Sequence, residues 1–317
     1  MPAADPMIID FHTHMYPEKI RERAMAAIPP PYHAAIDGSR AGLLRSMEEN
    51  RIDLAVNLPL VNTPRNARGV LAWAQMENHG PIRMLASLHP EDPDWKEHLE
   101  RICDMGFPGL KLHPEYQLFT FEEERFFPIW EACEEKGLFI LTHAGFDICF
   151  PPPFKTDPER LAKFHRRFPA LKLVLAHLGG MKMWDDVEKY LAGLPVYLDT
   201  AMIDENWISP EQMTRIIRKH GADRILFGSD SPWKGQDQCL RFIRSLEITE
   251  KEKAAILGEN AAGLLQISKN QRIAKLIPKR ISTRTGSTAR INLCSFAGNF
   301  KPLPVLTSRM NPSQPQP

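Results

Sequence analysis

The amino-acid sequence predicts one α/β domain, a (β/α)8 TIM barrel, followed by a C-terminal extension. Short runs of apolar and β-branched residues recur eight times over residues 7–228, and segments of helical periodicity separate them. Alternating strands and helices are typical of a parallel sheet, and eight repeats favour closure into a barrel. No glycine-rich phosphate loop follows the first run, which argues against the alternative of an open doubly wound sheet.

The predicted elements follow each other in regular order. The eight predicted strands are 7–12, 52–58, 82–88, 108–113, 138–142, 172–176, 196–199 and 224–228. The clearest helical segments are 94–105, 121–136, 157–168, 210–220 and 237–246, and a last helix is predicted over 250–265. Asp157 and Ser209 each precede a proline, and a capping residue before proline predicts that a helix begins there.

The composition is that of a globular protein, but its charge is unevenly distributed. The chain is 43% hydrophobic and 25% charged, with a formal net charge of +1. Residues 266–317 contain nine Lys or Arg and no Asp or Glu, so residues 1–265 carry a net charge of about −8. An acidic body predicts that the main domain does not bind nucleic acid. We predict a barrel domain over residues 1–267 and a basic, mostly disordered tail over 268–317.

The cysteines and the hydropathy predict where the protein is found. Five cysteines are scattered without C-x-x-C spacing, which indicates reduced intracellular thiols rather than disulfides or a zinc–cysteine site. No apolar run approaches the roughly 18 residues that span a bilayer, and no apolar leader precedes the first strand. The sequence therefore predicts a cytoplasmic protein that does not enter a membrane.

Histidine and aspartate residues follow the predicted strands at the end where barrel enzymes place their active sites. The first strand ends with His12 and His14, and residues two apart on a strand point to the same side. His143 follows the fifth strand, His177 the sixth and Asp230 the eighth. A polar pair at a strand exit, or a single hydrogen-bonded histidine, is ordinary by itself. Four strands that end this way indicate a divalent-cation site suited to Zn²⁺, Fe²⁺ or Mn²⁺.

This set of residues resembles the amidohydrolase superfamily, specifically its amidohydrolase-related branch. The resemblance rests on the two histidines after the first strand, the histidines after the fifth and sixth strands, and the Phe-Gly-Ser-Asp-x-Pro-Trp segment at 227–233. It covers roughly residues 7–265. The branch includes aminocarboxymuconate-semialdehyde decarboxylase and resorcylate-type decarboxylases.

The resemblance implies roles for the candidate residues. His12, His14, His143 and Asp230 would bind one or two metal ions per chain, with Zn²⁺ the first choice. Asp230 would also act as the general base. His177 would either polarise the substrate or bind a second metal. The resemblance also implies that the chain can form a homodimer.

Four further residues are predicted to bind a small-molecule substrate. In the fourth strand, Lys111 and His113 share one face and two leucines share the other, so both polar residues should point into the barrel. We expect Lys111 to pair with an acid such as Asp10 or with a substrate carboxylate, in preference to the carboxylated lysine of some superfamily members. Arg65, after the second strand, is a candidate for a substrate carboxylate, and Trp233 for a pocket wall.

The same ligands serve more than one reaction. The main prediction is hydrolysis of a C–N or C–O bond of a small molecule by metal-activated water. The alternative is non-oxidative decarboxylation of an unsaturated or aromatic carboxylic acid. We expect a hydrolase because the barrel body is shorter than that of the larger decarboxylases. A second alternative is a metal-stabilised binding protein without catalysis.

Overall fold

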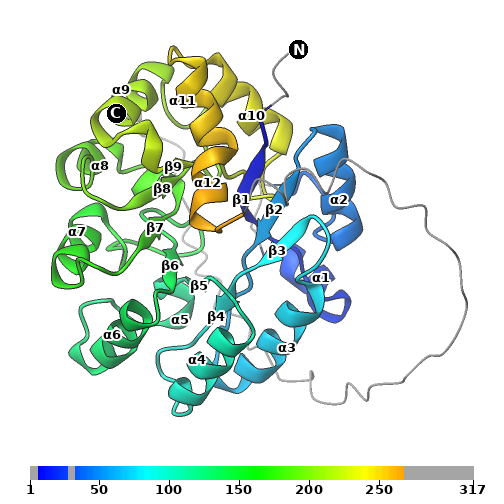
Figure 1. The fold of residues 1–317 in the computed structure, drawn as a ribbon, viewed down its shortest axis with the longest axis vertical. Coiled ribbons are helices and arrows are strands. Elements are labelled where there is room, and N and C mark those ends of the chain that lie inside the picture. Colours follow the sequence, from blue (N-terminus) through cyan, green and yellow to red (C-terminus); the bar gives the residue numbers. More distant parts are fainter. Residues whose placement is uncertain (1–5, 28–32, 268–317) are drawn as a thin grey trace, which may run out of the picture. The chain divides into compact units, whose positions relative to one another are not determined.

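The computed structural model describes residues 6–27 and 33–267 and contains a barrel of parallel strands surrounded by helices (Figure 1). The strands are β1 (Ile9–Thr13), β2 (Leu54–Asn57), β3 (Ile82–Met84), β4 (Ala86–Ser87), β5 (Gly109–Leu112), β6 (Phe139–Thr142), β7 (Leu173–Leu175), β8 (Tyr197–Asp199) and β9 (Ile225–Leu226). Every neighbouring pair is parallel. The predicted third strand appears as β3 and β4, which are separated only by Leu85.

Hydrogen bonds between the last and first strands close the barrel. The backbone N–H of Phe11 donates to the carbonyl oxygen of Phe227 over 2.7 Å, and Asp230 N–H donates to His12 over 2.8 Å. Thr13 and Ser231 also form a parallel bridge. Since β3 and β4 together make the third strand, the structure confirms the predicted eight-stranded barrel.

Helices cover the outside of the barrel and lie close to their predicted positions. They are α1 (Glu18–Met25), α2 (Arg40–Glu49), α3 (Ala67–Glu77), α4 (Trp95–Asp104), α5 (Pro114–Gln117), α6 (Phe127–Glu135), α7 (Pro158–Arg167), α8 (Trp184–Tyr190), α9 (Pro210–His220), α10 (Gln236–Ser245), α11 (Glu250–Ala254) and α12 (Asn260–Leu264). Asp157 and Ser209 cap α7 and α9 as predicted, because each side chain accepts a backbone N–H of the first turn.

Some predicted helix bounds differ from those in the structure. The segment predicted over 121–136 begins as a short 3-10 turn, η2 (Glu124–Phe126), and continues as α6. The last helix is divided by a π-helical turn, η5 (Ala255–Glu259), between α11 and α12. No helix in residues 6–27 and 33–267 is long and apolar enough to cross a membrane. The predicted tail, 268–317, lies outside the described residues and stays a prediction.

Two apolar cores pack on opposite sides of the strands. The larger core lies between the strands and the helices, and it includes Leu110 and Leu112 of β5. The smaller core includes Ile9 and Phe11 of β1, together with alternate residues of β2, β6, β7 and β9. Since the two cores take alternate residues of the same strands, the smaller one fills the barrel interior. The candidate site lies at the C-terminal ends of these strands.

An irregularity in β1 determines which of its side chains enter the barrel. Three residue steps in β1 match two in β2, between the pairs Asp10–Ala55 and Thr13–Asn57. Strict alternation would place His12 on the side opposite Phe11, next to the helices. The extra residue allows Phe11 to pack in the interior core while His12 also faces inward, 3.5 Å from the Nζ of Lys111.

Asp10 lies on the helix side of β1 and does not reach Lys111. Its Oδ2 accepts hydrogen bonds from the side chains of Ser229 and Gln236, the latter on α10. Its Oδ1 accepts the backbone N–H of Ser229. The prediction that Lys111 pairs with Asp10 is therefore wrong, and Asp10 instead anchors the segment that precedes Asp230.

Candidate metal centre

Three of the predicted ligands converge at the C-terminal ends of β1 and β9. One ligand atom from each of His12, His14 and Asp230 lies within 4.8 Å of the other two. The Oδ1 of Asp230 is 3.4 Å from the Nε2 of His12 and 3.1 Å from the Nε2 of His14. His12 and Asp230 are buried, and His14 is partly buried. The structure therefore brings two imidazoles and one carboxylate to a common point.

A carboxylate behind His12 determines which ring nitrogen faces this point. The Oδ2 of Asp199, the last residue of β8, lies 2.7 Å from the Nδ1 of His12. Burial raises the pKa of Asp199, but its interactions with His12, His177 and the N–H of Ala201 together outweigh burial and lower it, so the carboxylate is ionised and only accepts. His12 must therefore carry a proton on Nδ1. Burial lowers the pKa of His12 to about 4, so the ring is neutral near neutral pH and Nε2 keeps a lone pair.

The backbone orients His14 in the same way. The Nδ1 of His14 lies 3.0 Å from the carbonyl oxygen of Leu58, just past the end of β2. A carbonyl oxygen only accepts, so this nitrogen carries the proton and donates it. The Nε2 of His14 is then the nitrogen that faces Asp230.

Asp230 is held in an uncommon backbone conformation. Its φ of +67° lies in the left-handed region, which costs a residue other than glycine about 1–2 kcal/mol. Its backbone is fixed by the bond to His12 and by the N–H of Trp233, which donates to the Asp230 carbonyl over 2.9 Å. Burial raises the pKa of Asp230, but His12 and His14 outweigh it and hold the pKa well below its usual range. The carboxylate is therefore ionised.

These three side chains fit a divalent cation. Two Nε2 atoms and an ionised carboxylate repel each other unless a positive charge lies among them, either a proton that a ring shares with Asp230 or a metal ion that replaces this proton. Atoms bound about 2.0–2.2 Å from a zinc-type ion stand roughly 3.0–3.5 Å apart, which agrees with the two separations at Asp230. Imidazole and carboxylate donors suit Zn²⁺, Fe²⁺ and Mn²⁺.

His143 and His177 lie beside this group and are bonded to each other. The Nδ1 of His177 donates to the carbonyl oxygen of Ala201 over 3.0 Å, so its Nε2 can accept from the Nδ1 of His143 over 3.1 Å. Burial and the neighbouring His113 hold the pKa of His143 well below its usual range. The Nε2 of His143 is then a buried lone pair, and it has no hydrogen-bond partner within the described part of the chain.

The structure places His143 in a second group, with His113 and Asp147. The rings of His143 and His113 are stacked, with centroids 4.3 Å apart and planes within 14°. Lone pairs that lie in parallel ring planes do not converge on one ion. Asp147 Oδ2 also already lies 3.2 Å from the Nε2 of His113. In this conformation the second group is a hydrogen-bonded dyad beside a stacked ring rather than a metal site.

Lys111 points into the barrel beneath the candidate metal centre. It is buried, and its Nζ lies 3.5 Å from the Nε2 of His12. Burial lowers the pKa of Lys111 to about 8, against the opposing charges of Asp230 and Asp199. No carboxylate of the described residues forms an ion pair with Lys111 within 4 Å. The Lys111 amine faces the lone pair on the Nε2 of His12, and a metal bound to this nitrogen would use that lone pair.

The other predicted substrate residues lie in different parts of the mouth. His113 is buried and bonded to Asp147, at the end of β5. Trp233 is half-buried, and its ring centroid is 6.3 Å from that of Tyr16. Arg65 is exposed in the 3-10 turn η1 (Pro64–Asn66) that follows β2.

Sequence reasoning missed two acids that orient the histidines. Asp199 ends the seventh predicted strand, so the strand-end pattern that singled out Asp230 also contained the signal for it. Its other oxygen, Oδ1, accepts the backbone N–H groups of His177 and Ala201, each over 3.0 Å. Asp147 lies in the loop after β6, where no strand-end signal marks it.

Comparison with known protein families shows to which family this chain belongs. The family model for amidohydrolases matches residues 9–267, which includes the whole barrel and each candidate ligand. The chain belongs to the amidohydrolase family. The resemblance deduced from the histidine pattern is confirmed.

Several named relatives of this amidohydrolase are decarboxylases. A gamma-resorcylate decarboxylase from Polaromonas sp. strain JS666 is 23% identical, over 71% of this chain and 87% of the relative. The 5-carboxyvanillate decarboxylase of Sphingomonas paucimobilis has a similar structure, with a TM-score of 0.65 and 17% identity, over 83% of this chain and 100% of that one. A dihydroxybenzoic acid decarboxylase from Polaromonas sp. JS666, with bound manganese, has a TM-score of 0.64 and 18% identity. The match covers 83% of this chain and 97% of that one.

These relatives correct the main functional prediction. The prediction that this amidohydrolase is a hydrolase is wrong, since the relatives favour the carboxy-lyase alternative. The prediction relied on the length of the barrel body, which depends on the loops around the site and not on the bond that the site breaks. A divalent metal agrees with the manganese bound in the dihydroxybenzoic acid decarboxylase.

Proposed function

We propose that this amidohydrolase is a metal-dependent decarboxylase that releases CO₂ non-oxidatively from an aromatic or unsaturated carboxylic acid. The observation that carries the proposal is the convergence of His12 Nε2, His14 Nε2 and Asp230 Oδ1 at the mouth of the barrel. Similarity to resorcylate, carboxyvanillate and dihydroxybenzoate decarboxylases supports the choice of reaction.

His12, His14 and Asp230 would hold the metal, and His143 is the proposed fourth ligand because its buried Nε2 needs a partner. Mn²⁺ joins Zn²⁺ and Fe²⁺ as a candidate, given the manganese in one structural relative. When bound, the ion supplies positive charge that holds the oxygen atoms of the substrate. The homodimer implied by the family resemblance also remains a proposal.

The buried cationic and aromatic groups are proposed to bind the substrate. Lys111 lies next to His12, and no carboxylate within residues 6–27 and 33–267 forms an ion pair with it, so a substrate carboxylate would supply a counter-charge for this buried amine. His113, braced by Asp147, and Trp233 would bound the ring of the substrate. Arg65 is proposed as a further contact of the substrate carboxylate.

Decarboxylation requires a proton to replace the departing group. The C–C bond breaks, CO₂ leaves without the bonding electrons, and that electron pair forms the new C–H bond on the substrate carbon. Asp230 is the proposed proton carrier, whose carboxylate accepts the proton of a substrate hydroxyl group and then delivers it to this carbon. His177 is the proposed hydrogen-bonding partner of the substrate oxygen, and its ring is oriented by Ala201.

The proposal is tested with carboxyl-labelled hydroxybenzoic acids and metal-loaded enzyme in heavy water. We expect labelled CO₂ in the gas phase and one deuterium on the carbon that lost it. His12→Ala, which removes one proposed ligand, should release neither. If no acid of an ortho- and para-hydroxylated panel releases CO₂ at full metal occupancy, the proposed reaction is incorrect.

Lys111→Met is expected to weaken substrate binding. Loss of a hydrogen bond to a charged group costs about 1.5–3 kcal/mol, so KM should rise roughly 10- to 100-fold. Thermal stability should stay equal or increase, because the variant replaces a buried amine without an ion pair by an apolar chain of similar length. Steady-state kinetics and thermal unfolding measure the two effects.

The control for this variant is Lys189→Met, which removes an exposed amine from α8. It should change neither KM nor the melting temperature. A wild-type KM in Lys111→Met would show that the buried amine does not contact the substrate.

A further inference from the structure

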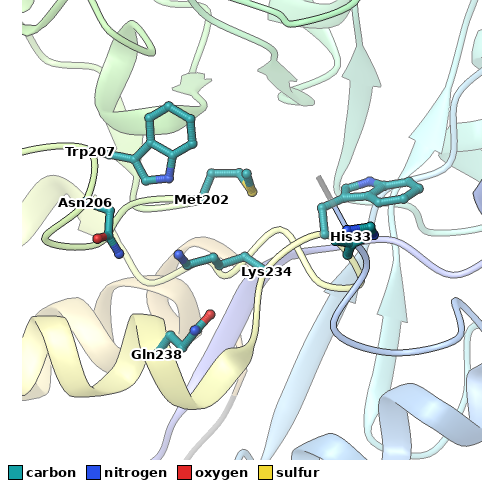
Figure 2. A pocket seen from close by; sticks show the side chains of 7 residues that line it. His33, Met202, Asn206, Trp207, Lys234 and Gln238 are labelled. Carbon is teal, nitrogen blue, oxygen red and sulfur yellow. The ribbon is translucent and has the colours of Figure 1, made fainter. Parts of the chain in front are cut away.

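A cavity of about 360 Å³ lies between the loop after β8 and the loop after β9 (Figure 2). Its volume is in the range of about 300–1,000 Å³ that small-molecule sites occupy. The lining residues combine aromatic and hydrogen-bonding side chains, and they are His33, Met202, Asn206, Trp207, Trp233, Lys234 and Gln238. Apart from Trp233, the functional predictions above include none of them.

Lys234 supplies a cation inside this cavity. Figure 2 shows its side chain extending between Trp207 and Gln238, with the amine end toward Asn206. The amine forms an ion pair with Asp204, whose side chain is only 3% exposed. Asp204 is itself held in place, because it accepts both the backbone N–H and the side-chain amide of Asn206.

Asp204 orients the Lys234 amine but uses only one of its hydrogen-bond donors. An ammonium group has three donors, and the bond to Asp204 uses one of them. The Lys234 side chain is 14% exposed, and this exposed part lines the cavity. A half-buried, pre-oriented ammonium with two further N–H donors is suited to an anionic group of a ligand.

Aromatic rings and a second cation lie beside this ammonium. Trp207 and Trp233 both line the cavity. The amine of Lys182 is 4.9 Å from the ring centroid of Trp207 and 4.4 Å from that of Phe146. Lys182 is exposed, so it adds positive charge near the rim. The surroundings therefore favour a ligand that is both aromatic and acidic.

The cavity walls are attached to the segment that carries Asp230. The backbone N–H of Met202 donates to the carbonyl oxygen of Ser229 over 3.2 Å, and the N–H of Trp233 donates to Asp230 over 2.9 Å. Trp233 also packs near Tyr16, two residues after His14 in the chain. Trp233 thus borders the cavity on one side and the metal-binding segment on the other.

We propose that this cavity is a subsite for a second acidic group of the substrate, so that the substrate class is an aromatic acid with an additional anionic substituent. The inference rests on the proposed decarboxylase function. The reacting carboxylate lies at the candidate metal centre, and the second acidic group accepts hydrogen bonds from Lys234. The ring between them lies against Trp233.

Binding of two probes to the metal-loaded enzyme tests this subsite by calorimetry. Isophthalate carries two carboxylates on one ring, and benzoate carries one. We expect isophthalate to bind at least tenfold more tightly than benzoate to the wild type. In Lys234→Met this ratio should fall toward one. Lys163→Met, an exposed lysine of α7, should leave the ratio at the wild-type value.

Lys234→Met leaves Asp204 buried without its partner, so the double variant Lys234→Met/Asp204→Asn removes both charges of the pair. The same fall in the ratio is expected in this variant, with thermal unfolding as the check on its fold. Equal affinities for the two probes in the wild type, or a ratio that Lys234 does not influence, would overturn the subsite whatever the CO₂ assay gives. Lys234-dependent preference without CO₂ release from any acid would overturn the proposed reaction alone.

Discussion

Asp199→Asn is expected to lower the affinity of the enzyme for its metal by about 10- to 100-fold, although Asp199 is not a proposed ligand. The Oδ1 of Asp199 accepts two backbone N–H groups, and its Oδ2 accepts the proton on His12 Nδ1. In the variant, the amide oxygen can keep the two backbone bonds, which leaves an NH₂ group facing His12. The ring must then move its proton to Nε2, and the lone pair that faces Asp230 is lost.

Metal affinity is measured by competition with a chromophoric chelator, on protein whose fold is checked by circular dichroism. Asp223→Asn is a matched control, because Asp223 is exposed in the 3-10 turn η4 (Ala222–Arg224). It should bind metal as the wild type does. Wild-type affinity in Asp199→Asn would mean that the orientation of His12 does not depend on this carboxylate.

Asp230→Asn is expected to reduce CO₂ release by about 10²- to 10⁴-fold, which is the usual contribution of a general acid or base. The amide keeps the shape of the side chain and an oxygen for the metal, but it cannot accept the proton that the reaction needs. The fold should survive, because asparagine tolerates the left-handed backbone that Asp230 adopts. Initial rates of CO₂ release, metal content and the melting temperature are measured on the same preparation.

Asp230→Ala serves as the comparison for this variant. Alanine removes the ligand atom and also tolerates the left-handed conformation less well, so both metal content and stability should fall. If Asp230→Asn binds metal and still releases CO₂ at the wild-type rate, Asp230 does not carry the proton.

Much of the fold could be predicted from the sequence because its signals are local. Alternating strands and helices predicted the parallel barrel, and Asp157 and Ser209 predicted where two helices begin. The leucines on one face of β5 correctly predicted that Lys111 points inward. Each of these signals involves only residues that are close in the sequence, so it can be recognised before the pairing of the strands is known.

The candidate site was predictable only as a set of strand ends. Parallel strands place their carboxyl ends at one face, so residues after β1, β6, β7 and β9 were expected to lie near each other. The structure brings His12, His14 and Asp230 together and places His143 in a neighbouring stacked pair. Which strand ends meet depends on register and on ring orientation, and neither leaves a trace in residue spacing.

Sequence signals alone predicted the barrel, the end of the barrel with the candidate site and the residue types of the candidate metal centre. Only the folded chain shows that Asp10 faces the helices while His12 faces the interior, because the extra residue in β1 breaks the alternation of the strand. It alone showed that Asp199 sets the protonated nitrogen of His12 and that Lys234 is held by Asp204. Asp199 and His12 are far apart in the chain, and only the closed barrel brings them within hydrogen-bonding distance. Asp204 and Lys234 meet because the loops after the neighbouring strands β8 and β9 lie side by side.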